Sequence, residues 1–211
     1  MNDLVTVTIA STGRKERLSD CIRSIDYDNV RVRVGVREGA DIPTDIQMTF
    51  SALFTNDFPV AVQNDLASSI EERSHVLAIA DDIIFEPGAI QEAVDTLNDA
   101  FPDGDGIIGL NITNMRNDQK CPYAFMLVGS KFFNERLARV LFFPGYRHFF
   151  ADMELGEYAE SLGRFRFCSE ARVIHFHPST GAPADRTHTE GRQGKWEHDN
   201  ELYLERKTRI R

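Results

Sequence analysis

The chain has 211 residues, of which 42% are hydrophobic and 27% are charged, and its formal net charge is −9. This composition is typical of a globular protein with one full core, and the acidic balance disfavours unspecific attraction to nucleic acid or anionic lipid. The three cysteines form no CxxC pair, which indicates reduced thiols rather than a disulfide framework. The N-terminus lacks the pattern of a signal peptide, and no run reaches the roughly 18 apolar residues of a membrane span, so we expect a cytoplasmic protein with no membrane segment.

The first hundred residues predict strands that alternate with helices. Four apolar or β-branched segments are the predicted strands: residues 4–10, 30–36 (nearer an edge), 58–62 and 76–80. Three segments are the predicted helices: the one with Leu18, Cys21, Ile22 and Ile25 on one face, residues 64–73, and the one begun by Pro87-Gly88. This alternation indicates a mostly parallel α/β sheet with right-handed crossovers.

The second half predicts further strands and helices around a turn at residues 102–106. The predicted strands are 107–112, 123–128 and 171–176, and the predicted helices are 131–142 and 152–162. From Pro178 the chain is polar, until the segment KWEHDNELYLERKTR predicts a terminal helix.

Two adjacent acids, Asp81 and Asp82, follow directly after the apolar run at 76–80. In open α/β sheets ligands bind at the carboxyl ends of the strands. Hard cations such as Mg²⁺ and Mn²⁺ prefer carboxylate oxygens, and a diphosphate completes their shell. The pair therefore predicts a metal and diphosphate site, and the alternative is a solvated turn that contains two acids.

Two later segments carry further candidates. Strand alternation in ARVIHFHPS places His175 and His177 on the same face, where either could complete a metal site, or both could be half-buried histidines. Asp152 begins a predicted helix, where the helix dipole favours an ionised carboxylate. A carboxylate held in this way can act as a general base, and the alternative is an ordinary N-cap acid.

Four motifs in this order resemble the family-2 glycosyltransferases of the GT-A fold, over roughly residues 4 to 178. They are STGRKERL after the first strand, QNDLASSIEERSHVLAIADDIIFEPGAI, FFADMELGEYAESLG and VIHFHPS. Two departures stand out. The family's acidic motif is commonly D-x-D, whereas Ile79 and Ala80 occupy the places of the earlier acid, and Ala151 stands where an acid usually precedes the base.

The resemblance implies an α/β fold of GT-A type, a single domain with a mostly parallel central sheet flanked by helices. Residues 1–178 would form this domain, with a Rossmann-like nucleotide-binding half at about 1–100 and an acceptor half at 101–178. Residues 179–211 would form a mobile loop, able to close over the donor, and a C-terminal helix.

The resemblance also implies an inverting glycosyltransferase that moves a hexosyl or related sugar from a nucleotide-sugar donor, UDP-linked, to an acceptor hydroxyl with the help of Mn²⁺ or Mg²⁺. Asp152 would be the catalytic base. The donor would contact Ala10, Ser11, Thr12, Arg14, Glu38 (or Asp41), Asn64 and Asp81. The metal ligands would be Asp82, Asp81 and either His175 or His177.

Other functions remain open at this point. The chain could be a sugar-nucleotide-binding or catalytically inactive GT-A module, or a nucleotidyltransferase of the same fold, against which the single glycine of ASTGRKER argues. The acceptor could be a saccharide, a protein or a hydroxylated DNA base in a modified nucleic acid. Five arginines on the acceptor half favour a phosphate-bearing acceptor: Arg136, Arg139, Arg147, Arg164 and Arg166. The sequence does not indicate an oligomeric state.

Overall fold

The computed structural model describes residues 3–43, 50–55, 58–115, 121–184 and 194–208. Within these ranges the centre of the molecule is an eight-stranded sheet with the order β3-β2-β1-β4-β7-β6-β8-β5. The strands are β1 Val5–Ser11, β2 Val30–Arg37, β3 Phe50–Thr55, β4 His75–Ala80, β5 Ile83–Phe85, β6 Ile107–Ile112, β7 Met126–Val128 and β8 Phe165–His175. Only β7 and β5 run antiparallel to their neighbours in this sheet, so the mostly parallel α/β sheet is confirmed.

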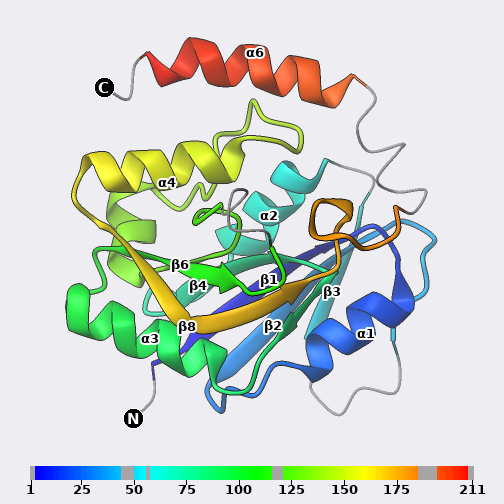
Figure 1. Ribbon diagram of the computed structural model, residues 1–211, viewed down its shortest axis with the longest axis horizontal. Helices are drawn as coiled ribbons and strands as arrows, with labels where there is room; N and C mark the ends of the chain where they lie inside the picture. Colours follow the sequence, from blue (N-terminus) through cyan, green and yellow to red (C-terminus); the bar gives the residue numbers. More distant parts are fainter. Residues whose placement is uncertain (1–2, 44–49, 56–57, 116–120, 185–193, 209–211) are drawn as a thin grey trace.

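Helices cover both faces of the sheet (Figure 1). Helices α1 (Lys15–Arg23) and α3 (Ala89–Ala100) pack on one face, and α2 (Pro59–Ser68) and α4 (Ala151–Ser161) pack on the other. The last helix, α6 (Lys195–Lys207), lies along the outer side of α4. Two short turns complete the described helical structure: a π-helical turn at Phe132–Arg136 and a 3₁₀ turn at Pro178–Thr180. No helix of the described residues is long and apolar enough to cross a membrane.

The side-chain pattern of the strands explains the two helical layers. In β1, Val5, Val7 and Ile9 are buried in the larger core beneath α1 and α3, because alternate side chains of a strand point to opposite faces. On the other face, α2 approaches β2 at Gly35, where an added Cβ would lie 2.1 Å from Cγ1 of Val62. The close packing of α2 on the sheet therefore requires a glycine at this strand position.

Strand register brings three distant segments to one edge of the sheet. Ala10 of β1 pairs with Ala80 of β4 in parallel register, so the residues that follow these strands lie side by side. Ile83 of β5 pairs with His175 of β8, and the backbone N–H of Phe176 donates to the carbonyl of Asp82 at 2.8 Å. The fold itself therefore places the end of β8 next to the acids that follow β4.

Five of the predicted elements differ from the structure. The helix predicted at residues 64–73 already ends at Ser68, and the strand predicted at 123–128 begins only at Met126.

The other three differ more strongly. The strand predicted at residues 58–62 is wrong, because Pro59 begins α2, and proline suits the first turn of a helix, where its missing N–H costs nothing. Of the helix predicted at 131–142, the structure has only the π-helical turn at Phe132–Arg136, since Ala138 and Arg139 both have a positive φ that ends a helix. The last strand begins six residues earlier than residue 171, at Phe165, and passes an irregularity in its pairing with β6.

The C-terminal segment holds the predicted terminal helix, α6. Most of the segment predicted as a mobile loop, residues 185–193, lies outside the described residues. The three cysteines are free thiols, as the sequence indicates.

Candidate functional site

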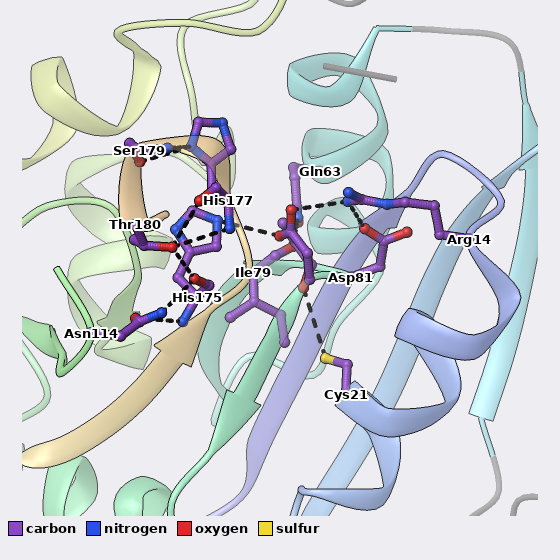
Figure 2. A network of polar contacts seen from close by, with 12 residues as sticks. Arg14, Cys21, Gln63, Ile79, Asp81, Asn114, His175, His177, Ser179 and Thr180 are labelled. Atoms are coloured by element: carbon purple, nitrogen blue, oxygen red, sulfur yellow. Dashed lines mark hydrogen bonds and ion pairs between the residues drawn. The ribbon is translucent and has the colours of Figure 1, made fainter. Parts of the chain in front are cut away.

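The acids after β4 are buried and pair with a cation from the neighbouring strand end. The exposed fractions of Asp81 and Asp82 are 1% and 4%. The hydroxyl of Ser11, the last residue of β1, donates to Oδ2 of Asp81 at 2.6 Å. The guanidinium of Arg14 pairs with Oδ1 of Asp81 and lies 3.1 Å from Oδ2 of Asp82. Figure 2 shows Arg14 reaching toward Asp81 across the end of β1.

His175, at the end of β8, contacts the acids from the opposite side. Its Nε2 lies 3.3 Å from Oδ1 of Asp82. The backbone of His175 is held by the side-chain amide of Asn114, which accepts from its N–H at 3.0 Å and donates to its carbonyl at 2.8 Å (Figure 2). Each of the four carboxylate oxygens of Asp81 and Asp82 therefore has a polar contact with Ser11, Arg14 or His175.

For each of the two acids, burial acts to raise the pKa of the carboxyl and the neighbouring hydrogen-bond donors act to lower it. Burial raises the pKa of Asp81, and the guanidinium of Arg14 and the hydroxyl of Ser11 oppose that rise only in part. Burial also acts to raise the pKa of Asp82, but the hydrogen bond and charge of His175, together with Arg14, outweigh it and hold this pKa below its ordinary value. The charge of the acid pair is thus compensated from within the protein.

Asp152 lies in the first turn of α4, separate from this cluster in sequence and in hydrogen bonding. Its Oδ1 accepts from the N–H of Met153 at 2.9 Å. Burial raises the pKa of the Asp152 carboxyl to about 6, although backbone N–H groups partly stabilise its charge. A carboxylate with a pKa in this range can take up a proton near neutral pH, which is what a general base requires.

The loop that leads to Asp152 is held by α6. Asp199 of α6 is fully buried, and its carboxylate accepts from the backbone N–H groups of Arg147, His148 and Phe149 at 3.0, 2.8 and 2.8 Å. Asp199 is not among the candidates that the sequence predicts, because an acid in a polar terminal helix has no pattern that distinguishes it from a solvated one. The backbone then passes through Phe150 with φ 64° before α4 begins.

A second contact fixes α6 to α4. The guanidinium of Arg206 donates to both carboxylate oxygens of Glu154 at 2.8 Å, and the hydroxyl of Tyr146 donates to Oε2 of the same residue at 2.7 Å. Two-point pairing of this kind is geometrically specific. Helix α6 is therefore part of the support of the loop and helix that carry Asp152.

The other four residues predicted to contact the donor lie at the ends of β1 and β2 or on helix α2. Ala10 is the partly buried penultimate residue of β1, and Thr12 is exposed just beyond the strand. Glu38 is exposed directly after β2. Asn64, on α2, exchanges two hydrogen bonds of 2.8 Å with the backbone of Phe142, so its amide already has a structural partner.

His177 is placed differently from His175. The two rings stack with centroids 5.1 Å apart. Nδ1 of His177 accepts from the backbone N–H of Ser179 at 3.2 Å and caps the 3₁₀ turn that begins at Pro178. Of the two histidines predicted as metal ligands, His175 is the one whose ring faces Asp82.

The donor chemistry of Asp81, Asp82 and His175 fits a hard divalent cation, because it offers carboxylate oxygens and one imidazole. Their present arrangement is not a preformed metal site: among the described residues, no three His, Cys, Asp or Glu side chains converge to hold an ion. The guanidinium of Arg14 lies against both acids, in the place where a bridging cation would be expected.

At least three of the five arginines of the acceptor half have polar contacts within the protein. Arg136 and Arg164 both pair with Asp105, at 2.6 and 3.6 Å. Arg139 donates to the carbonyl of Ile70 at 2.6 Å. The phosphate-bearing acceptor, which the clustering of these residues in the sequence favours, stays a prediction.

No protein-family model matches the chain, and no curated protein matches it. Among solved structures, the inositol-1-phosphate CTP transferase from T. maritima is 9% identical, with a TM-score of 0.51 over 89% of this chain and 94% of its own. Rv0371c from Mycobacterium tuberculosis H37Rv is 11% identical, with a TM-score of 0.47 over 80% of this chain and 89% of its own. The apo-form glycosyltransferase GlyE from Streptococcus pneumoniae TIGR4 is 12% identical, with a TM-score of 0.41 over 64% of this chain and 36% of its own.

These likenesses concern the fold alone. The chain has a mixed α/β single-domain fold, with a curled eight-stranded sheet flanked by helices, of the Rossmann-like type found in GT-A proteins and nucleotidyltransferases. In folds of this type the ligand lies outside the carboxyl ends of the strands, which is where Ser11, Arg14, Asp81 and Asp82 meet.

Proposed function

We propose that the protein is an inverting glycosyltransferase that uses a nucleotide-sugar donor, UDP-linked, and a divalent metal. The observation that carries this proposal is the buried acid pair at the carboxyl end of β4, contacted by Arg14 from one side and His175 from the other. Buried carboxylates cost several kcal/mol unless cations compensate them, so a fold that retains two of them at its ligand-binding edge has a use for their charge.

The donor would lie over the ends of β1, β2 and β4. Arg14 would pair with the diphosphate, since a guanidinium binds phosphate oxygens through two parallel hydrogen bonds. Ser11, Thr12 and Glu38 lie at the ends of β1 and β2, where they would contact the nucleoside. Asp82, Asp81 and His175 would hold Mn²⁺ or Mg²⁺, which when bound neutralises the charge of the departing diphosphate.

Asp152 would act on the acceptor. The acceptor oxygen attacks the anomeric carbon, the bond from that carbon to the diphosphate oxygen breaks, and the acceptor proton passes to the carboxylate of Asp152. Attack from the face opposite the leaving group inverts the anomeric configuration. The pKa of about 6 at Asp152 supports this role, because the group is ionised at neutral pH yet basic enough to accept a proton.

A second candidate is nucleotidyl transfer. It is favoured by the likeness to the inositol-1-phosphate CTP transferase, whose TM-score of 0.51 exceeds those of the other two neighbours. Such a reaction would join a nucleoside triphosphate to a sugar phosphate or alcohol phosphate and release pyrophosphate. A third candidate is a module of the same fold that binds a sugar nucleotide without catalysis.

The test is a thermal-shift screen of nucleotides and sugar nucleotides, each with and without Mn²⁺, followed by product analysis. Selective stabilisation by one sugar nucleotide, and release of its nucleoside diphosphate when saccharide, protein or hydroxylated DNA acceptors are added, is the expected result. Pyrophosphate released from a nucleoside triphosphate would identify the second candidate. Binding without turnover of any acceptor would favour the third, and no response to any nucleotide would contradict all three.

A further inference from the structure

Arg14 occupies both acids on which metal binding would depend. Its guanidinium pairs with Oδ1 of Asp81 and with Oδ2 of Asp82, while Ser11 and His175 contact the other two carboxylate oxygens. We propose that Arg14 is an exchangeable internal counter-ion, which closes the metal site until a nucleotide diphosphate draws it away. This inference rests on the proposed function and adds to it an order of binding, in which nucleotide opens the site for metal.

The guanidinium and a divalent ion compete for the same charge. The acid pair carries at most two negative charges, and Arg14 already supplies one positive charge in contact with both carboxylates. An ion that entered beside Arg14 would meet a like charge in a poorly hydrated site, where the repulsion is weakly screened. Occupation by Arg14 and occupation by metal are therefore mutually exclusive.

Arg14 differs from the two acids in that it precedes a helix rather than following a buried strand directly, and its side chain keeps contact with solvent. Asp81 and Asp82 follow β4 directly and are buried, and His175 is anchored through Asn114. Arg14 instead stands between the end of β1 and the start of α1, after Gly13 with φ 92°, and its side chain is 17% exposed. Its cationic group can therefore turn toward a ligand while the acids remain in place.

A diphosphate offers Arg14 an equivalent partner. One nitrogen of the guanidinium contacts both carboxylates, whereas a phosphate group can accept two parallel hydrogen bonds from a guanidinium, so the phosphate and the acids compete for Arg14. When the diphosphate takes Arg14, the two carboxylates lose their counter-ion and gain affinity for a divalent ion. Because coupling between two binding sites is reciprocal, metal must raise nucleotide affinity by the same factor by which nucleotide raises metal affinity.

The test measures Mn²⁺ binding directly, by the electron paramagnetic resonance signal of free Mn²⁺ and by thermal shift. The proteins are wild type, Arg14→Gln, Arg14→Lys and Arg17→Gln, without nucleotide and with UDP, CDP or GDP in separate titrations. Arg17→Gln is the matched control, since it removes the same charge three residues further along the chain, from a guanidinium whose carbon lies 4.3 Å from the centroid of the Phe176 ring.

Without nucleotide, Arg14→Gln should bind Mn²⁺ at least about tenfold more tightly than wild type. Arg14→Lys should lie between them, because it keeps a positive charge but on a shorter side chain without the planar guanidinium, and Arg17→Gln should stay within about twofold of wild type. Arg14→Gln leaves the buried acids without their guanidinium, so its unfolding temperature should be lowered without metal and raised again by Mn²⁺. The same Mn²⁺ concentration should leave wild type unshifted.

Equal Mn²⁺ affinity of wild type and Arg14→Gln would overturn the inference, and so would tight Mn²⁺ binding by nucleotide-free wild type. If a nucleotide binds wild type but Mn²⁺ leaves its affinity unchanged, the exchange fails while nucleotide binding stands. If no nucleotide binds at all, the proposed function fails, and the nucleotide-free comparison of Arg14→Gln with wild type still decides whether Arg14 and metal compete.

Discussion

Replacement of Asp152 by asparagine should make the protein more stable and less active. The pKa of the Asp152 carboxyl is raised from an ordinary value of 3.8 to about 6, mainly by burial. A raised pKa in the folded state means that the ionised form is disfavoured by folding. Asparagine keeps the acceptor for the N–H of Met153 and carries no charge. The substitution therefore removes the cost of burying an ionised carboxylate and retains the hydrogen bond.

The sign and size follow from linkage. Well below pH 3.8 the carboxyl is protonated in both the folded and the unfolded protein, so it does not lower the free energy of unfolding. As the pH rises from 3.8 to about 6, the unfolded protein ionises first and the folded protein loses stability. At pH 7 the cost of a shift of this size is about 3 kcal/mol, with each pKa unit worth about 1.4 kcal/mol. Because Asp152 keeps some contact with solvent, this value is an upper bound.

The assay is urea denaturation of wild type and Asp152→Asn at pH 7 and pH 5. We expect the variant to gain up to about 3 kcal/mol at pH 7 and about half of that at pH 5, where linkage leaves about half of the cost. Asp99→Asn, which removes an exposed acid of α3, is the control for net charge. Glycosyl transfer should fall by about 10²-fold or more, as for loss of a general base. Equal or lower stability of Asp152→Asn at pH 7 would refute the reasoning, and undiminished transfer would remove Asp152 from the mechanism.

Three further substitutions test the site and its support. Asp82→Ala should weaken Mn²⁺ binding in the presence of nucleotide by about 10- to 100-fold, as loss of a metal ligand or its support does. Titration of free Mn²⁺ measures this, and an unchanged affinity would exclude Asp82 as a ligand. Asp199→Asn should lower the free energy of unfolding by about 1–3 kcal/mol, because the buried carboxylate of Asp199 accepts from three backbone N–H groups. Urea denaturation measures this change, and an unchanged free energy of unfolding would contradict the supporting role of α6. Gly35→Ala should cost about 1–3 kcal/mol by overpacking, since the added Cβ would lie 2.1 Å from Cγ1 of Val62, and the companion substitution Val62→Ala should recover part of that loss.

The sequence predicted the elements whose signals are local. The buried strand at residues 4–10, the amphipathic helix after it and the Pro87-Gly88 helix start all correspond to elements of the structure. Periodicity also predicted that Asp81 and Asp82 follow a buried strand. The apolar run at residues 58–62 has no clear alternation and suggests a strand, but the structure has a helix there, for which Pro59 at the first position is the stronger signal.

What the sequence could not predict depends on pairing between distant segments. The strand β3 carries little alternation and owes its place to the parallel ladder with β2. The contact between His175 and Asp82 depends on the antiparallel register of β5 and β8, which no local pattern encodes. The same holds for Asp199, because its partners lie about fifty residues earlier in the chain and are backbone N–H groups, which any residue type would present.

Arg14 shows why the sequence alone does not predict all the contacts of the site around Asp81 and Asp82. A basic residue just after the first strand predicts a phosphate contact, but its pairing with both Asp81 and Asp82 is a property of the β1–β4 register. Ile79 and Ala80, which directly precede the two acids, carry no charge. A third carboxylate there would add a negative charge to the two acids that Arg14 already contacts, and a buried charge without a counter-ion is costly. The substitution Ala80→Asp should therefore lower the unfolding temperature without metal, and Mn²⁺ should raise it again in a thermal-shift assay.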